Sequence, residues 1–122
     1  ATELGRLLAR RRAPIKSVLL DQGLFAGVGN WIADEVLYQA GLRPQRPASE
    51  LSPEEVGRLR ARLRAIVKRA VAVDADSDRF PGTWLFHHRW GRNAEARTSR
   101  REQILHDTIG GRTTAWVPSR QR

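Results

Sequence analysis

The sequence contains no cysteine, and this absence removes several classes of protein at once. Without thiols there is no disulfide framework and no thiolate metal site, so redox chemistry does not identify the compartment. No apolar run approaches the roughly 18 residues that a membrane-spanning helix needs. The first residues lack the apolar centre and cleavage site of a secretory signal. We therefore expect an intracellular protein, in the cytoplasm and nucleoid or in the nucleus.

Metal-ligating patterns are equally scarce. His87 and His88 are adjacent, His106 lies far along the chain, and no His-x-x-x-His spacing occurs. The acidic segment 74–79 resembles a calcium loop, but it lacks the glycine and the closing glutamate that such a loop requires. The sequence predicts no metal site and no cofactor.

Positive charge, in contrast, is abundant. The 122 residues carry a net charge of +9 with a pI near 11.5, which indicates a polyanionic partner. The excess lies in the C-terminal part, because residues 79–122 contain nine arginines and only three acidic residues. The alternative is a solvated basic surface, since runs of charge are common on helix faces.

Residues 15–41 have the pattern of two short helices joined by a glycine-rich double turn. The first helix is expected over residues 14–22 and the second over residues 31–40. Asn30 has the chemistry of an N-cap for the second helix, and Gly41 can end it. A glycine turn that leads into a helix N-terminus presents N–H groups and a positive dipole end, which favours a phosphate.

The flanking helices are predicted from similar signals. Residues 3–12 are expected to form a short helix. Ser52, Pro53 and Glu55 form a capping-box pattern that predicts a helix running to about Val73. Within the second helix of the double-turn stretch, Asp34 and Glu35 are adjacent, so their side chains point about 100° apart. We interpret these carboxylates as structural rather than as a shared site.

A β-hairpin is predicted near the C-terminus. Residues 103–109 and 112–117 flank Gly110-Gly111, a two-residue turn suited to positive φ. Arg112 lies beside the turn, where its guanidinium can reach a backbone phosphate. The hairpin is expected to end at Pro118, and the SRQR tail is expected to be mobile.

These two regions together resemble the formamidopyrimidine-DNA glycosylase and endonuclease VIII family of base-excision repair enzymes. The matching stretches are IKSVLLDQGLFAGVGNWIADEVLYQAGLRPQRPASELS and GGRTTAWVP. The resemblance implies a mainly α fold, with a helix–two-turn–helix domain of four to five helices and a C-terminal two-stranded antiparallel hairpin. It implies two units, residues 1–86 and residues 87–122.

The hairpin corresponds to the family's DNA-binding finger. Most bacterial members bind zinc there through four cysteines. This chain instead resembles the plant and fungal type, whose zincless finger keeps the hairpin without metal. Apolar packing by Ile104, Trp116 and Val117 is then expected to hold the finger. The family's N-terminal catalytic domain, which begins with a nucleophilic proline followed by glutamate, is not supplied by these residues.

The resemblance also assigns DNA-binding residues, namely Lys16, Gly27, Gly29, Asn30 and Arg112. Position alone predicts an exposed side chain for Lys16, and the resemblance places it near the lesion. Asn30 and Arg112 match residues that contact phosphates around the damaged nucleotide, and the two glycines allow close backbone approach. The expected picture is a two-part clamp, with Lys16 and Asn30 facing Arg112 across the damaged strand.

The predicted function is the DNA-binding half of a DNA glycosylase/AP lyase that acts on oxidised bases. The expected partners are double-stranded DNA with oxidised or abasic sites and the catalytic domain of the same chain, with a monomer as the default state. The fragment alone is expected to be inactive. The main alternative is a non-enzymatic RNA-binding protein with a ribosomal-type helix–two-turn–helix. An isolated regulatory DNA-binding module is a third interpretation.

Overall fold

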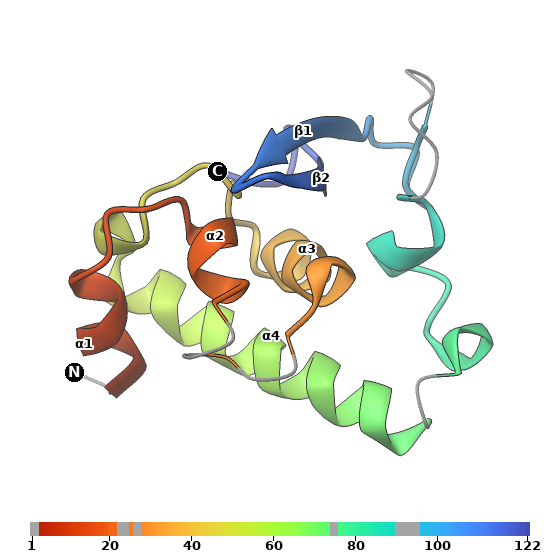
Figure 1. The fold of residues 1–122 in the computed structure, drawn as a ribbon. Coiled ribbons are helices and arrows are strands. Elements are labelled where there is room, and N and C mark those ends of the chain that lie inside the picture. The colour runs from red at the N-terminus through yellow and green to blue at the C-terminus, as the bar shows by residue number, and fades with distance from the viewer. Residues whose placement is uncertain (1–2, 22–24, 26–27, 74–75, 90–95) are drawn as a thin grey trace.

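The computed structural model describes residues 3–21, 25, 28–73, 76–89 and 96–122. Four α-helices precede a two-stranded antiparallel sheet, and three short 3₁₀ helices (η) lie between them (Figure 1). The elements are α1 (Glu3–Ala9), α2 (Ile15–Leu19), α3 (Asn30–Ala40), η1 (Ala48–Glu50), α4 (Pro53–Ala72), η2 (Ser77–Arg79), η3 (Leu85–His87), β1 (Leu105–Ile109) and β2 (Arg112–Trp116). The predicted mainly α fold with a C-terminal hairpin is confirmed.

Helix α3 is the central element, with α4 beneath it and the hairpin above it (Figure 1). It is buried on most of its surface, and it ends at Gly41, which adopts the predicted left-handed conformation with φ of 73°. Helix α4 packs an apolar stripe against α3, and its buried residues are Val56, Leu59 and Ile66. Each such side chain contributes about 1.5–3 kcal/mol on burial. The contact between α3 and α4 is therefore a large part of the main apolar core.

The predicted capping box at the start of α4 is confirmed. The Ser52 hydroxyl accepts a hydrogen bond from the Glu55 backbone N–H, and the Glu55 carboxylate accepts one from the Ser52 N–H. Pro53 occupies the first helical position, where its missing N–H costs no intrahelical bond. Residues one to three apart determine this feature, which is why the sequence predicts it well.

Two helices are shorter than the sequence predicts. Helix α1 ends at Ala9 rather than at residue 12, although its inward-facing Leu8 is buried as expected. Helix α2 covers only Ile15–Leu19, whereas the sequence predicts a helix over residues 14–22. The start of α2 is held by a distant segment, because the Ile15 N–H donates to the Arg46 carbonyl at 2.7 Å. Among the described residues, no helix is long and apolar enough to cross a membrane.

The hairpin has the predicted turn. Gly110 and Gly111 have φ of 60° and 76°, and Ile109 pairs with Arg112 across them. Thr114 is buried in the second arm, and so is its neighbour Ala115. The Thr114 hydroxyl accepts from the buried Lys16 of α2, whereas Ala115 packs in a second apolar cluster. That cluster contains Tyr38, Leu85, Ile104, Ala115 and Val117.

Two expectations about the C-terminal region change. Ile104 and Val117 do pack in the second apolar cluster, whereas Trp116 lies under the Arg43 guanidinium at 5.1 Å. The expectation that the C-terminal tail is mobile is wrong. The Gln121 side chain accepts from the Val117 N–H at 2.6 Å and donates to the Leu42 carbonyl at 2.8 Å. Gln121 is buried and satisfies two backbone groups, so the tail is part of the fold.

An aromatic cluster lies beside the first turn of α3. Trp31 contacts Phe80 and Phe86 with ring centroids 5.2 and 4.9 Å apart, and Phe80 stacks on Trp84 at 5.1 Å. Phe86 is held in place by Glu35, whose carboxylate accepts from the Phe86 backbone N–H at 2.7 Å. The segment after α4 is thereby attached to α3.

Candidate nucleic-acid interface

The N-terminus of α3 differs from the sequence prediction. Asn30 is the first helical residue rather than the N-cap, so the predicted capping role is wrong. Gly29 takes the cap position with extended backbone, and within the described ranges no side-chain hydrogen bond caps the helix. The first turn of an α-helix leaves N–H groups without intrahelical acceptors, and these suit an external anion. Gly29 is exposed, and a Cβ added to it meets nothing within 4 Å.

The Asn30 side chain reaches the hairpin instead of its own helix. Its Nδ2 donates to the Thr113 carbonyl at 2.9 Å. An amide nitrogen carries two hydrogens, so a second donor is available to a ligand. The Asn30 Oδ1 atom is buried and has no hydrogen-bond partner among the described residues. Asn30 therefore joins α3 to β2 at the place where the resemblance assigns a phosphate contact.

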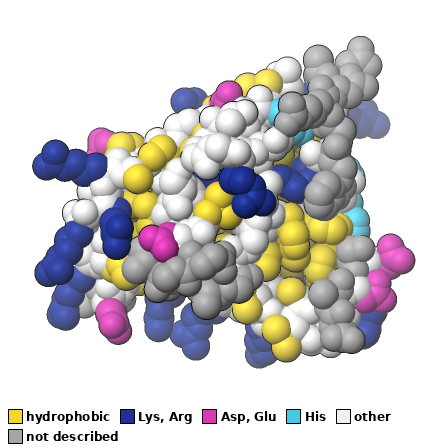
Figure 2. Space-filling model, in the orientation of Figure 1, with side chains coloured by type: hydrophobic (Ala, Val, Ile, Leu, Met, Phe, Trp, Pro, Cys, Tyr) yellow, Lys and Arg dark blue, Asp and Glu magenta, His cyan; other side chains and the backbone are white. Residues whose placement is uncertain are grey.

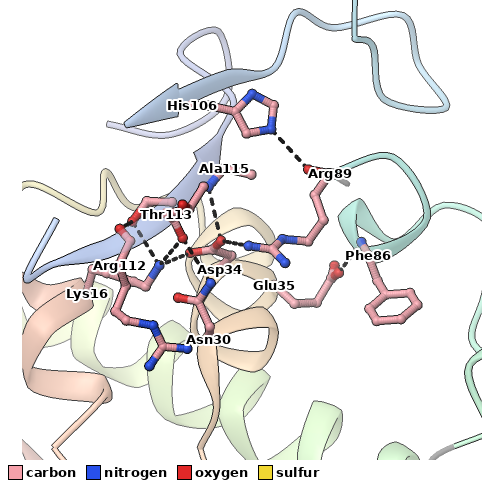
Figure 3. A network of polar contacts seen from close by, with 11 residues as sticks. Lys16, Asn30, Asp34, Glu35, Phe86, Arg89, His106, Arg112, Thr113 and Ala115 are labelled. Carbon is pink, nitrogen blue, oxygen red and sulfur yellow. Dashed lines mark hydrogen bonds and ion pairs between the residues drawn. The ribbon is translucent and has the colours of Figure 1, made fainter. Parts of the chain in front are cut away.

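Lys16 is fully buried, so its predicted exposure is wrong. Its Nζ donates to Asp34 Oδ1 at 2.5 Å and to Thr114 Oγ1 at 2.9 Å, and lies 3.5 Å from the Thr113 carbonyl (Figure 3). Burial lowers the pKa of Lys16, and the Asp34 carboxylate opposes that shift only in part. All three ammonium donors are directed at protein acceptors in this arrangement. The DNA contact assigned to Lys16 stays a prediction.

Asp34 is the centre of a buried polar junction, which we define as Lys16, Asp34, Arg89 and the backbone of β2. Its Oδ2 accepts from Arg89 Nη2 at 2.5 Å and from the Ala115 backbone N–H at 3.0 Å (Figure 3). The side-chain exposure is 0% for Lys16 and Asp34 and 6% for Arg89. Buried charges are tolerated when they are paired and hydrogen-bonded, as these are. The polar junction therefore fixes the hairpin on α3.

Glu35 points to a different side of α3 and likewise accepts hydrogen bonds from a distant segment. Its carboxylate accepts from the Leu85 and Phe86 backbone N–H groups at 3.1 and 2.7 Å, and from Gln39 Nε2 at 2.9 Å. Burial raises the pKa of Glu35, although these hydrogen bonds reduce the shift. The structural interpretation of Asp34 and Glu35 is confirmed, because each attaches a different segment to α3.

Arg112 is exposed at the start of β2, and Figure 3 shows it beside Asn30. The hairpin tip is fixed against α2, since a Cβ on Gly110 would lie 2.7 Å from Ser17 Oγ. Gly27, the remaining predicted site residue, lies outside the described residues. Gly29, Asn30 and Arg112 thus form one continuous surface, which we call the α3–hairpin surface.

The predicted two-part clamp needs correction. Asn30 and Lys16 hydrogen-bond directly to β2, so no strand passes between them and the hairpin. A ligand therefore meets one joined surface rather than two separated arms.

Sequence reasoning missed Arg89 as a functional residue. The residue is 7% exposed and paired with Asp34, which lies 55 positions away. A usable signal was present in α3, where Asp34 and Glu35 are the two charged residues of a mostly buried helix. Carboxylates in a helix that is buried nearly all round require buried donors from elsewhere.

Comparison with known proteins agrees with this architecture. Residues 1–81 match the model of the formamidopyrimidine-DNA glycosylase H2TH domain. The chain is 46% identical over 120 residues to a formamidopyrimidine-DNA glycosylase of Arabidopsis thaliana, covering 98% of this chain and 30% of that protein. A glycosylase of the same name from Moorella thermoacetica is 51% identical over 72 residues, covering 59% of this chain and 26% of that protein.

Solved structures give the same result for the fold. A complex between Lactococcus lactis Fpg and abasic-site DNA superposes with a TM-score of 0.81 at 26% identity. A complex of the same enzyme with Fapy-dG DNA gives 0.81 at 26% identity. Each match covers 98% of this chain and 46% of the solved chain. The chain therefore spans less than half the length of these relatives. It belongs to the formamidopyrimidine-DNA glycosylase family, whose H2TH domain it carries.

Proposed function

We propose that this chain is the DNA-binding part of a base-excision-repair glycosylase/AP lyase, and that the α3–hairpin surface contacts phosphates around a flipped-out nucleotide. The observation that carries the proposal is the docking of the hairpin on the uncapped N-terminus of α3. This docking brings Arg112 beside Asn30, the residue that follows Gly29. A guanidinium, an amide donor and the first-turn N–H groups of a helix then lie on the same surface. Each of these groups favours a phosphate oxygen.

The reaction of a DNA glycosylase explains why contacts to the DNA backbone are needed. A glycosylase extrudes its target nucleotide from the duplex, which costs a few kcal/mol in lost stacking and pairing. Contacts to the backbone on either side offset that cost without reading sequence. Similar solved proteins are complexes with abasic-site and Fapy-dG DNA, which is the class of ligand we propose here.

The catalytic step is assigned to residues outside this match. The family resemblance gives the Schiff base to an N-terminal proline in a separate domain. We therefore expect the 122 residues alone to bind DNA without lyase activity. Borohydride treatment with abasic-site duplex should yield no covalent adduct, and a trapped adduct would contradict this assignment.

Binding is tested with Arg112→Ala and a duplex that carries an abasic-site analogue. Loss of one phosphate contact should weaken binding and lower the salt dependence of log K by about 0.9. The measurement is a fluorescence-anisotropy titration across a range of salt concentrations. Arg60→Ala is the matched control, because it removes the same charge from an exposed position on α4. An unchanged slope for Arg112→Ala, or tighter binding to RNA than to the duplex, would overturn the proposal.

A further inference from the structure

A second basic site lies at the other end of α3. A cleft there is lined by Tyr38 and Gln39 from α3, Arg62 from α4, Thr83 and Trp84 before η3, and two further arginines, Arg100 and Arg120. Gln39 is nine residues beyond Asn30, which places it about 13 Å along the helix axis. The cleft is therefore separate from the α3–hairpin surface.

The three arginines come from segments that are far apart in sequence. Arg62 and Arg100 are exposed, and neither forms an ion pair with an acidic residue within the part of the chain that the structure describes. Arg120 pairs with Glu102 at 3.0 Å. Among the described residues, three guanidinium groups around one cleft thus outnumber the two carboxylates beside it, Glu102 and the buried Glu35. Like charges held together repel each other, and an anion in the cleft relieves that repulsion.

The backbone at Arg100 is held by a hydrogen-bonded turn. Thr98 is buried, and its hydroxyl donates to the Glu102 carboxylate at 3.0 Å. The same hydroxyl accepts from the backbone N–H groups of Arg100 and Glu102, both at 3.2 Å. Within this turn, Arg101 has φ of 64°, a left-handed conformation that non-glycine residues rarely adopt. A hydrogen-bonded turn with a strained residue therefore presents Arg100 to the cleft.

Glu102 holds the side of the cleft that Tyr38 and Arg120 form. Its carboxylate accepts from the Tyr38 hydroxyl at 3.3 Å and from Arg120 Nε at 3.0 Å. The Arg120 guanidinium lies 5.5 Å from the centre of the Tyr38 ring. Arg120 is thereby held over α3 rather than extended into solvent.

The aromatic residues of the cleft narrow the choice of ligand. One face of Tyr38 is covered by Arg120, and Trp84 stacks on Phe80. The cleft is lined by more guanidinium groups than aromatic rings, and guanidinium forks match phosphate oxygens. The lining therefore favours recognition of phosphate.

We propose that this cleft, which we call the arginine cleft, binds phosphodiester groups of a nucleic-acid segment other than the one at the α3–hairpin surface. The choice of nucleic acid rests on the proposed function. The arginine cleft supplies a second, sequence-independent contact to the backbone.

The test compares two double variants that remove the same charge. Arg62→Ala/Arg100→Ala removes two of the three arginines that line the arginine cleft. Arg60→Ala/Arg64→Ala removes two exposed arginines of α4 that do not line it. The probes are a short undamaged duplex and inorganic phosphate. The variant that lacks the two cleft arginines should bind the duplex about tenfold more weakly, as expected for loss of hydrogen bonds to a charged group. The control variant should show a smaller loss. NMR titration should move the amide signals of Gln39 and Thr83 in the parent chain and in the control, but not in the cleft variant.

Three results would overturn the proposal. Equal losses in both double variants would mean that only total charge matters. Signals of Gln39 and Thr83 that move with inorganic phosphate but not with duplex would exclude nucleic acid as the source of the phosphate. Absence of any shift with either probe would exclude an anion site. Arg112→Ala measured in parallel separates the two proposals. An effect of Arg112→Ala without an effect of the cleft variant contradicts only the arginine cleft, and the reverse contradicts only the α3–hairpin surface.

Discussion

Helix α3 makes two contacts of opposite chemistry. Towards α4 it buries apolar side chains such as Leu37, which belongs to the same apolar cluster as Leu59 of α4. Towards the hairpin it uses the polar junction centred on Asp34. An apolar contact stabilises in proportion to the area removed from water and tolerates small shifts. A buried charge cluster is sensitive to the loss of any one partner, so it specifies the position of the hairpin more than it adds stability.

The largest effect should come from breaking the polar junction. Asp34→Asn removes the carboxylate charge that pairs with both Lys16 and Arg89 in the buried polar junction. Loss of one partner from a buried ion pair costs about 3–5 kcal/mol, and we expect the free energy of unfolding to fall by that amount. The measurement is urea unfolding followed by circular dichroism.

A substitution in the apolar contact between α3 and α4 should lower the stability by a similar amount. Leu59→Ala should lower the free energy of unfolding by about 2–5 kcal/mol, because it removes a fully buried side chain from α4. Hydrogen exchange separates the two variants. The Ala115 amide should lose protection before global unfolding in Asp34→Asn, but not in Leu59→Ala. Equal protection in both variants would mean that the polar junction does not fix the hairpin.

The hairpin tip gives a smaller effect. Gly110 and Gly111 both have positive φ, so alanine at either position costs about 1–2 kcal/mol. Only Gly110→Ala also forces Ser17 to move, at a further cost of about 0.5–1.5 kcal/mol. Thermal unfolding should therefore rank Gly110→Ala below Gly111→Ala in stability. Ser17→Ala in the same chain should remove most of that difference, and a difference that persists would place its cause elsewhere.

The smallest effect should come from an ion pair at the surface. Hydrogen bonding by Arg46 lowers the pKa of Glu55 below its ordinary value, although partial burial opposes the shift. A lowered pKa stabilises the fold above the unfolded-state value of about 4.3, and this contribution is lost as the pH falls further. Glu55→Gln keeps the capping box, so it removes only the charge. The loss at neutral pH should be below about 1 kcal/mol, because the pair is partly exposed.

The control for this measurement is Glu54→Gln, which removes a neighbouring exposed acid from the same helical turn. The stability difference between Glu55→Gln and the parent chain should disappear in acid. A difference that grows as the pH falls would show that the charge of Glu55 is not its cause.

The difference between contacts among neighbouring residues and contacts between distant residues explains which features the sequence predicts. The Ser52 capping box, the end of α3 at Gly41 and the Gly110-Gly111 turn depend on neighbours within a few residues, and all three were predicted correctly. The burial of Lys16 depends on Thr114, which lies 98 positions away. Asn30 fails as a cap because Gly29 already fills that position and the hairpin offers an acceptor. The assigned DNA contacts and the division at residue 86 stay predictions.

The aromatic cluster next to α3 has a practical consequence for these experiments. Trp31 directly follows Asn30 and contacts two phenylalanine rings, so its indole is held in a fixed asymmetric environment. Fixed rings in contact give a near-ultraviolet circular dichroism signal, which is lost when tertiary packing loosens. The protein thus carries an intrinsic optical reporter at the base of the α3–hairpin surface.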